Sequence, residues 1–372
     1  MKRIAMLRVN PSAIGPSYAR FEDLLGRRGH KVFMITWEWD GLGPQRVDFE
    51  MYRVRRLVTK LPKVPGRGIV FFLIWFVFSL KQLRDFRPEH IVGFNIDALI
   101  PALAYRLTRR VPATLYFLDS YPGAFPFGTP KALRMVFTAI EHFVSRLSDF
   151  IIFVDEARAT QLSFQMLPEN STVVYNSPVA VPASAKWPFS SRAHLRVFYG
   201  GGLHRDRGIP ALIDAVKTIP AVELVVAGDG PLAEWIARAS RESDNVIFLG
   251  RIPHEELMKY TRASDVIPCF YDPRVPNNKL ASPNKLFEAM ALGKYVLTNS
   301  GQRVADYVRK HDIGSVVEYD NPTEIASQLR QLISNPDRLA NVAARSPSIF
   351  QETYSWTTSL LRLDTYFKRF DL

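Results

Sequence analysis

Residues 282–294, Ser-Pro-Asn-Lys-Leu-Phe-Glu-Ala-Met-Ala-Leu-Gly-Lys, constrain the fold more than any other stretch of the chain. Ser282 is a favoured N-cap residue, and Pro283 suits the first helical position, where a missing N–H costs nothing. The apolar residues that follow lie on one helix face, and Gly293 ends the helix before a short strand at 295–298. The segment therefore predicts a capped helix that leads directly into a strand.

The same segment carries polar groups suited to a nucleoside diphosphate. A helix N-terminus offers unpaired N–H groups and a partial positive charge, which together favour phosphate. Lys285 adds a full charge in the first turn, next to Asn284, and Glu288 one turn further on could accept both hydroxyls of a ribose. The alternative is an ordinary surface helix that happens to carry a lysine and a glutamate.

The composition indicates a globular chain of two domains. Its 372 residues are too many for one typical core and enough for two α/β domains, and 47% of them are hydrophobic. The single cysteine, Cys269, excludes an internal disulfide framework and is compatible with a reducing cytoplasm. No secretory signal is visible, because only four apolar residues separate Lys2-Arg3 from Arg8.

Positive charge is concentrated in the first third of the chain. The net charge is +12, and residues 1–110 hold 20 Lys and Arg against 9 Asp and Glu, a balance of +11. Such an excess suits nucleic acid or an anionic membrane surface. The basic residues adjoin a very apolar stretch and no nucleic-acid fingerprint is present, so the pattern favours a membrane surface and argues against nucleic acid.

Region 46–80 combines the two signals that membrane-surface binding needs. Seven Lys and Arg residues lie between 46 and 67, in what we expect to be a loop, and residues 69–78 are all apolar. Ten residues are too few to cross a bilayer, which needs about 20. The stretch is therefore either a core helix of the first domain or a segment that lies in the membrane interface beside the basic loop.

The first half of the chain alternates strands and helices. We expect strands at 2–9, 32–36, 91–93, 114–118 and 150–154, and helices at 17–28 and 129–147. A loop at 10–16 contains Gly15, and Asn95 and Asp97 are expected in the loop after the third strand. Asp119 follows the fourth strand, at the carboxyl edge where parallel sheets bind ligands, and could act as a general base. It could equally be a turn residue before Pro122.

The second half repeats the alternation after a linker rich in proline and serine at 177–194. A strand at 195–199 leads into Gly200-Gly201-Gly202 and Arg207, and a helix follows at 209–217. Glycines allow a pyrophosphate to approach the backbone, and arginine binds it bidentately. Further strands are expected at 222–227, before Gly230, at 246–250, before Arg251 and Ile252, and at 265–270. A short helix is expected at 255–261 and an amphipathic one at 356–370.

The motifs of the second half resemble those of GT-B glycosyltransferases, family 4 in particular. That family reads Glu, seven residues, Glu, then Ala-Met-Ala-x-Gly; here Glu288 precedes Ala289-Met290-Ala291-Leu292-Gly293. The family's first glutamate would fall at Leu280, so it is missing, and the chain looks like the branch with Ser-Pro-Asn-Lys-x-x-Glu. The resemblance is strong over 195–298 and looser over 1–175.

The resemblance implies an α/β fold of the GT-B type, with two Rossmann-like domains facing each other across a cleft. Residues 1–176 would form the acceptor-binding domain, completed by a C-terminal helix at 355–372, and 195–354 the nucleotide-sugar-binding domain. The implied nucleotide-binding residues are Ser282, Asn284, Lys285, Glu288, Arg207, Gly230, Arg251 and Ile252. Arg207 stands where the family usually has lysine, and Gly202 where it has arginine.

The residues near the donor sugar are less constrained by the resemblance. Gly15 and Gly202 occupy the positions of the loops that approach sugar and phosphate in the family. Asn277, Asn278 and Lys279 are the polar groups nearest the missing glutamate, and could take over its sugar contacts. Asp119 stands where family members often have histidine. The family retains anomeric configuration, which implies retention here, although an aspartate at this position leaves inversion open.

The chain is expected to work without a metal or other cofactor. It contains no Asp-x-Asp pair and no zinc-ligand spacing. Arg207, Lys285 and the helix dipole would neutralise the diphosphate leaving group instead.

We therefore predict an enzyme that transfers a sugar from a nucleotide sugar to a lipid-linked or polysaccharide acceptor. It would be cytoplasmic and peripheral on the inner membrane face, through region 46–80. Two alternatives remain: a nucleotide-sugar epimerase of the same fold, and a catalytically silent nucleotide-binding partner of another transferase.

Overall fold

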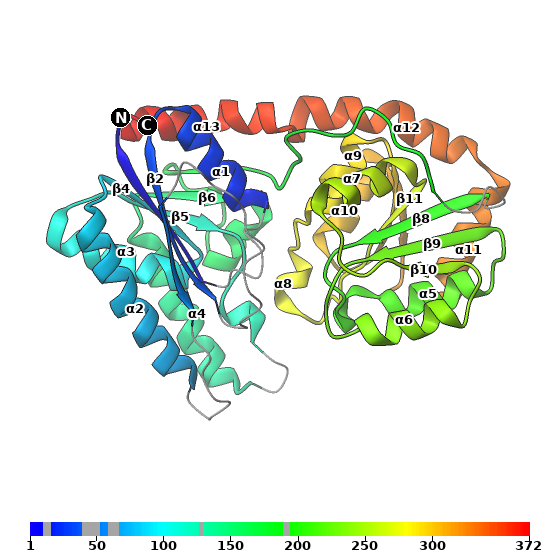
Figure 1. The fold of residues 1–372 in the computed structure, drawn as a ribbon, viewed down its shortest axis with the longest axis horizontal. Coiled ribbons are helices and arrows are strands. Elements are labelled where there is room, and N and C mark those ends of the chain that lie inside the picture. Colours follow the sequence, from blue (N-terminus) through cyan, green and yellow to red (C-terminus); the bar gives the residue numbers. More distant parts are fainter. Residues whose placement is uncertain (10–15, 39–52, 59–66, 126–128, 189–193) are drawn as a thin grey trace. The chain divides into compact units, whose positions relative to one another are not determined.

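The computed structural model describes residues 1–9, 16–38, 53–58, 67–125, 129–188 and 194–372 (Figure 1). The chain forms two compact units. Unit 1 comprises Met1–Val174 and Leu360–Leu372, and unit 2 comprises Tyr175–Ser359. Gly15 and parts of region 46–80, namely 46–52 and 59–66, lie outside the described residues.

Unit 1 is built on a parallel sheet of seven strands in the order β3-β2-β1-β4-β5-β6-β7. The strands are β1 (Arg3–Val9), β2 (Lys31–Glu38), β3 (Arg53–Val58), β4 (His90–Phe94), β5 (Ala113–Phe117), β6 (Phe150–Phe153) and β7 (Ser171–Val173). The helices are α1 (Pro16–Arg27), α2 (Arg67–Phe86), α3 (Ile96–Arg109) and α4 (Lys131–Arg146), with 3-10 turns η1 (Pro122–Ala124) and η2 (Glu156–Leu162). Strands β4, β5 and β6 are buried throughout, as expected where helices cover both faces of a sheet.

Two expectations for unit 1 are wrong. Residues 53–58 of the expected basic loop form strand β3, which pairs with β2 and extends the sheet. Asp97 lies in the first turn of α3 rather than in a loop, because helix α3 begins immediately after Asn95. Asn95 itself has a φ of 65°, which turns the chain from β4 into the helix.

Helix α2 packs against the sheet on one side only. Trp75, Ser79 and Leu83 are buried, and the Trp75 indole N–H donates to the backbone oxygen of Asp97 at 3.0 Å. Val70 and Val77 on the other side are exposed. Among the described residues, no helix has the length and apolar character that crossing a membrane requires.

Unit 2 is built on a parallel sheet of six strands in the order β10-β9-β8-β11-β12-β13. The strands are β8 (Leu195–Gly200), β9 (Val222–Ala227), β10 (Val246–Phe248), β11 (Val266–Cys269), β12 (Tyr295–Asn299) and β13 (Gly314–Val317). The helices are α5 (Ile209–Lys217), α6 (Ala233–Arg241), α7 (His254–Ala263), α8 (Pro276–Lys279), α9 (Asn284–Ala291), α10 (Arg303–His311), α11 (Pro322–Ser334) and α12 (Asp337–Ile349). A 3-10 turn, η3, spans Arg205–Arg207, and α12 continues through a π-helical turn, η4 (Phe350–Tyr354).

The last helix returns the chain to unit 1. Helix α13 (Trp356–Phe370) has the bounds expected from its amphipathic pattern. Tyr366 and Leu363 are fully buried, and the Tyr366 hydroxyl lies 2.8 Å from Nε2 of the buried His90. Phe367 stacks under the guanidinium of Arg28, the residue after α1, whose carbon lies 3.8 Å from the ring centroid.

Each sheet changes winding direction beside its first strand. The chain runs outward from β1 to β2 and β3, then crosses to β4 on the other side; in unit 2 it runs from β8 to β9 and β10, then crosses to β11. In open α/β sheets, ligands bind at the carboxyl ends of the strands beside such a switch. We therefore expect the ligand site of unit 2 at the carboxyl ends of β8 and β11.

Candidate functional site

Two glycine-containing loops meet at the carboxyl ends of β8 and β9. The Gly201 N–H donates to the Ala227 oxygen at 3.0 Å, and the Leu203 N–H to the Asp229 oxygen at 2.9 Å. A Cβ on Gly228 would lie 1.9 Å from the Gly201 oxygen, and one on Gly230 2.7 Å from the Leu203 oxygen. Only glycine permits this approach of backbone to backbone, so Gly230 shapes the loop that follows β8.

Helix α9 places Lys285 against the loop after β8. The Lys285 ammonium lies 3.8 Å from the centroid of the Tyr199 ring, and a Cβ on Gly201 would be 3.5 Å from its Nζ. Burial lowers the pKa of Lys285 to about 8. A cation held over an aromatic face, beside a glycine backbone and at a helix N-terminus, is suited to an anionic ligand.

The start of helix α9 differs from the expectation in one detail. Pro283 occupies the cap position, its side chain provides no capping oxygen, and the helix begins at Asn284. The backbone oxygen of the buried Ser282 accepts the Asn176 amide at 2.7 Å, which holds the segment before the helix. Ser282 therefore anchors the entry to the helix and is not its cap, because the helix starts one residue later than predicted.

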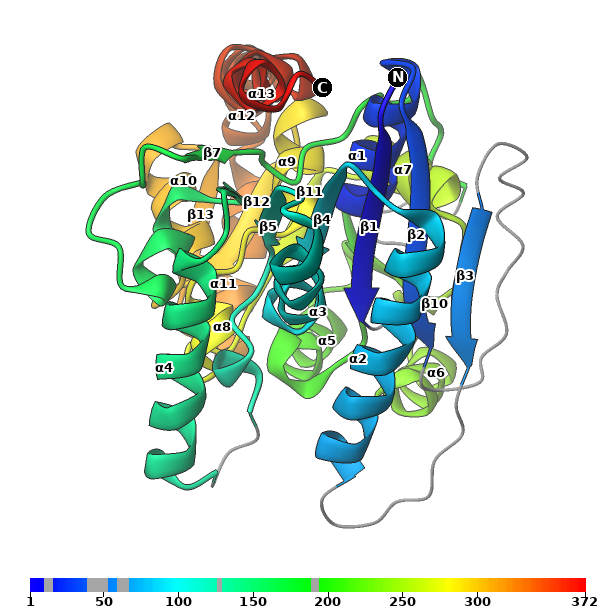
Figure 2. The same ribbon diagram turned by 90° about the vertical axis from the view of Figure 1, so that its left-hand side faces the viewer.

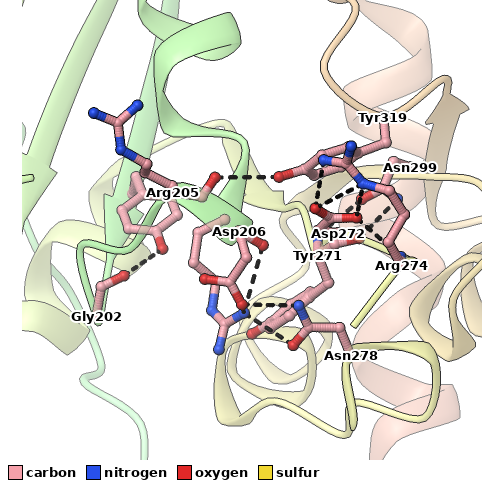
Figure 3. Close-up of polar contacts among 11 residues, drawn as sticks. Gly202, Arg205, Asp206, Tyr271, Asp272, Arg274, Asn278, Asn299 and Tyr319 are labelled. Carbon is pink, nitrogen blue, oxygen red and sulfur yellow. Dashed lines mark hydrogen bonds and ion pairs between the residues drawn. The ribbon is translucent and has the colours of Figure 1, made fainter. Parts of the chain in front are cut away.

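Arg207 is held by a polar cluster that joins η3 to α8. Figure 3 labels Asp206 and Asn278 of this cluster. The Arg207 guanidinium donates to Asp206 Oδ2 at 2.6 Å and to Asn278 Oδ1 at 3.0 Å, and lies over the Tyr271 ring at 4.6 Å. Asn278 in turn donates to Asp206 Oδ2 at 2.9 Å. Asn278 is buried, and both ends of its amide take part in this cluster.

The segment after β11 is fixed by further contacts that the sequence did not suggest. The Asn299 side chain bonds both backbone groups of Tyr271, with Oδ1 accepting at 2.8 Å and Nδ2 donating at 3.0 Å. The Asp272 carboxylate accepts twice from the Arg274 guanidinium, and the Tyr319 hydroxyl donates to the Arg205 oxygen, as Figure 3 shows. These bonds hold the Tyr271 ring under Arg207.

Glu288 is buried and has a histidine beside it. Only 4% of Glu288 is exposed, and its Oε1 lies 3.8 Å from Nε2 of His254, the first residue of α7. The loop before α7 contributes Arg251, which is exposed, and Ile252, which is partly buried. Since α7 packs against α9, this loop and Glu288 lie on neighbouring elements.

The structure thus brings together most of the predicted residues of unit 2. Lys285 and Gly230 lie against the loop after β8, which contains Gly202. Arg207 and Asn278 share one cluster, and Glu288 is on the same helix as Lys285. Lys279 is exposed at the end of α8 and Asn277 is partly buried on the same helix.

In unit 1, Asp119 follows strand β5 and is held from two sides. Asn95 Oδ1 accepts the backbone N–H of Asp119 at 3.1 Å and that of Leu118 at 2.8 Å. The nearly buried Arg158 places its guanidinium 2.8 Å from Asp119 Oδ1, while 55% of the Asp119 side chain stays exposed. A carboxylate that is both oriented and accessible can act on a substrate.

Further ionisable groups lie near Asp119, and for Glu141 and Arg8 no sequence pattern pointed to this position. The buried Glu141 of α4 accepts the Ser120 hydroxyl at 2.6 Å and the Tyr121 N–H at 2.7 Å. Burial raises the pKa of both Glu141 and Asp97 to about 7. Arg8, at the end of β1, has a buried guanidinium nitrogen without a hydrogen-bond partner among the described residues. No spacing rule links these residues, because they come from different strands and helices.

Comparison with known protein families covers most of both units. Residues 19–177 match the family described as Glycosyltransferase Family 4, and residues 194–335 match the one described as Glycosyl transferases group 1. The chain is a family 4-like glycosyltransferase. The expected family is thereby confirmed, as is the expectation of an enzyme.

The relatives have low sequence identity to this glycosyltransferase, but their alignments cover most of its chain. It is 24% identical over 297 residues to a glycogen synthase of Mycobacterium tuberculosis, covering 75% of this chain and 69% of that one. It is 22% identical over 359 residues to a UDP-N-acetylglucosamine–N-acetylmuramyl-(pentapeptide) pyrophosphoryl-undecaprenol N-acetylglucosamine transferase of Geobacter sulfurreducens, covering 88% of each chain. The Geobacter relative is named for the transfer of N-acetylglucosamine, in line with the transferase interpretation.

Solved structures confirm the GT-B fold. A sucrose-phosphate synthase from Thermosynechococcus elongatus superposes with a TM-score of 0.79 at 17% identity, with 99% of each chain covered. Anabaena HepE in complex with UDP and glucose superposes with a TM-score of 0.75 at 15% identity, with 99% of this chain and 100% of that one covered.

Proposed function

We propose that this glycosyltransferase takes its sugar from a nucleoside diphosphate sugar and transfers it to a lipid-linked or polysaccharide acceptor at the cytoplasmic face of a membrane. The observation that carries the proposal is the position of Lys285, over Tyr199 and beside Gly201, on the helix that also bears Glu288. A uridine diphosphate sugar is the first candidate. HepE was solved with UDP and glucose, and the Geobacter relative is named for a UDP sugar and an undecaprenol acceptor.

Lys285 and Arg207 would bind the pyrophosphate. The backbone N–H groups at the start of α9 add donors, and the Gly201–Gly202 backbone admits a phosphate that a side chain would block. In the structure Arg207 is paired with Asp206, so a bound phosphate would compete for the same guanidinium. Two cations and a helix N-terminus also neutralise the leaving diphosphate, and we propose that transfer needs no metal ion.

Glu288 would bind the ribose, and the loop around Gly230, Arg251 and Ile252 would hold the base. Because Glu288 is buried, few water molecules have to leave its carboxylate when two ribose hydroxyls bind to it. His254, close to Oε1, would help to orient that carboxylate. Because both amide ends of Asn278 are used by Arg207 and Asp206, we assign Asn278 to supporting Arg207 and the exposed Lys279 to the sugar.

Asp119 would act on the acceptor in unit 1. Its carboxylate is exposed and oriented by Asn95 and Arg158, so it could orient an acceptor hydroxyl or accept its proton. We propose transfer with retention of configuration, as in the family that the chain resembles.

A thermal-shift titration tests the nucleotide site. A ligand that binds only the folded state at about 100 times its Kd adds about 2.7 kcal/mol to stability, which for a unit of this size is roughly 5–10 °C. We expect UDP to shift the wild type more than GDP, ADP, TDP or CMP. Glu288→Gln should weaken binding by roughly 10- to 100-fold, because it removes a charge from the hydrogen bonds to the ribose.

Glu255→Gln is the matched control, since Glu255 lies on α7 but is exposed. It should respond like the wild type. If no nucleoside diphosphate shifts the wild type, or if Glu288→Gln responds in full, the assignment of this site fails. Release of UDP from UDP sugars in the presence of excess EDTA then tests the metal-independent reaction, which loss of turnover on metal removal would contradict.

A further inference from the structure

Helix α4 carries its large apolar side chains on the outside. Six of them are exposed: Leu133, Met135, Val136, Ile140, Phe143 and Leu147, the last directly after the helix. Five of the six recur at intervals of three and four residues, so they form one stripe along the helix. Phe143 is 65% exposed and Met135 71%.

The inward side of α4 is partly polar, because only Phe137 among its large apolar side chains packs against the aromatic rings of Tyr121 and Phe125. Glu141 and Ser145 are its buried residues, and Glu141 is bonded to Ser120 and to the Tyr121 backbone. A surface helix normally points its apolar stripe at the core and its charges at water. In helix α4 the two buried residues are polar and the six apolar residues named above are exposed, so burial within unit 1 does not explain them. A contiguous apolar surface of this kind marks an interaction site.

Helix α2 adds a second apolar stripe in the same layer of unit 1. Val70, Leu73 and Val77 are exposed at intervals of three and four residues. Helices α2 and α4 both pack against α3, and Figure 2 shows the N-terminal parts of α2 and α4 extending beyond the carboxyl ends of the strands. The two stripes therefore belong to one helix layer, in which α3 lies between α2 and α4.

The exposed charges on α4 are positive. From 130 to 147 the only carboxylate is that of the buried Glu141, whereas Lys131 and Arg146 are exposed. Residues 1–110 are also basic as a whole, with 20 Lys and Arg against 9 Asp and Glu. A second copy of the chain would bring these cations against each other across a two-fold axis, whereas an anionic lipid surface would pair with them.

We propose that the exposed stripes of α4 and α2, the α4–α2 surface, bind the headgroup region of an anionic lipid bilayer. This deepens the proposed function by placing the lipid contact chiefly on α4, outside region 46–80, and it rests on the lipid-linked class of acceptor proposed above. The apolar side chains of the α4–α2 surface would enter the interfacial region of the bilayer, and Lys131 and Arg146 would contact the anionic headgroups. Apolar burial and charge attraction are the two signals that stable attachment needs.

Vesicle flotation without donor or acceptor tests the α4–α2 surface. The wild type should float with vesicles of phosphatidylcholine and phosphatidylglycerol, and remain unbound with phosphatidylcholine alone. Val136→Asp/Phe143→Asp should weaken binding by about tenfold or more, because a carboxylate replaces apolar area and repels the headgroups. Lys131→Glu should weaken binding less, and added salt should reduce that difference.

Leu361→Asp is the control, since Leu361 is a 73%-exposed leucine on α13. It should float like the wild type. The proposal is overturned if the wild type ignores anionic vesicles, if the α4 variant floats like the wild type, or if sedimentation shows a wild-type dimer that the α4 variant dissociates. The nucleotide thermal shift of each variant reports folding and the unit 2 site separately, so failure here is distinct from failure of the proposed function.

Discussion

Burial against the loop after β8 lowers the pKa of the Lys285 ammonium to about 8. A bound pyrophosphate favours the protonated lysine, so the pKa must be higher in the complex than in the free protein. Binding then takes up protons once the pH exceeds about 8. The affinity for UDP should therefore fall as the pH rises from 7.5 to 9, by up to tenfold per unit.

Calorimetric titration at several pH values measures this dependence. Lys285→Met should bind UDP roughly 10- to 100-fold more weakly at pH 7, since it loses a charged hydrogen bond, and its affinity should vary less with pH. Equal pH dependence in the wild type and in Lys285→Met would show that another group titrates.

Asp119 is the residue on which the chemistry of unit 1 depends in our proposal. Asp119→Asn keeps the shape and one acceptor oxygen but cannot take a proton. We expect kcat to fall by roughly 10²- to 10³-fold with little change in UDP binding. Asp23→Asn, at an exposed ion-paired carboxylate of α1, is the control and should leave kcat unchanged. A kcat for Asp119→Asn within a factor of about three of the wild type would remove Asp119 from the mechanism.

At the scale of elements, the contact between the loops after β8 and β9 determines the position of the backbone beside Lys285, where we propose that the pyrophosphate binds. Gly228 has a φ of 151°, and a Cβ there would overlap the Gly201 oxygen at 1.9 Å. Gly228→Ala must push the two loops apart, which should lower the free energy of unfolding of unit 2 by roughly 3 kcal/mol and weaken UDP binding.

Gly250→Ala separates the cost of the backbone angle from that of the contact. Gly250 has a φ of 67°, but nothing lies within 4 Å of a Cβ there. This variant should lose only about 1 kcal/mol of stability. Urea unfolding followed by hydrogen exchange of unit 2 amides measures the stability of both variants. Equal losses of stability in Gly228→Ala and Gly250→Ala would mean that the two loops can move apart without cost.

At the scale of the whole molecule, buried ionisable groups give unit 1 its own pH dependence. Burial raises the pKa of Glu22, Asp97 and Glu141 to about 7 and lowers that of His90 to about 3. Between pH 4.5 and 7 the native carboxyls hold protons that the unfolded chain has released, which stabilises unit 1 as the pH falls. His90 acts oppositely below pH 6.5, because only the unfolded imidazole is protonated.

Three carboxyls outweigh one imidazole, so unit 1 should become more stable as the pH is lowered from 7 to about 5, by of the order of 1 kcal/mol per unit. Glu141→Gln should flatten this dependence, because glutamine can accept from Ser120 but does not titrate. Hydrogen exchange of unit 1 amides in urea at pH 5, 6 and 7 measures it. A stability that falls over this range in the wild type would contradict the assignment of neutral carboxyls.

The alternation of apolar runs with glycine and proline signals was enough to place most strands and helices. Val222–Ala227 and Ile209–Lys217 have the expected bounds, because a fully buried strand and a Pro-started helix leave strong local patterns. The motif from Ser282 to Gly293 likewise predicted a helix with Lys285 and Glu288 at one end. Such information is local, and the sequence alone determines it.

Only the tertiary structure decided which distant side chains meet. Arg207 and Asn278 are separated by 71 positions in the sequence, and Asp119 and Arg158 by 39, yet the side chains of each pair are in contact. The same holds for the outward apolar side of α4, since a helical pattern shows a stripe but not the direction in which it faces. Pairings between strands and helices depend on how the whole sheet is wound, and no short stretch of sequence contains that information.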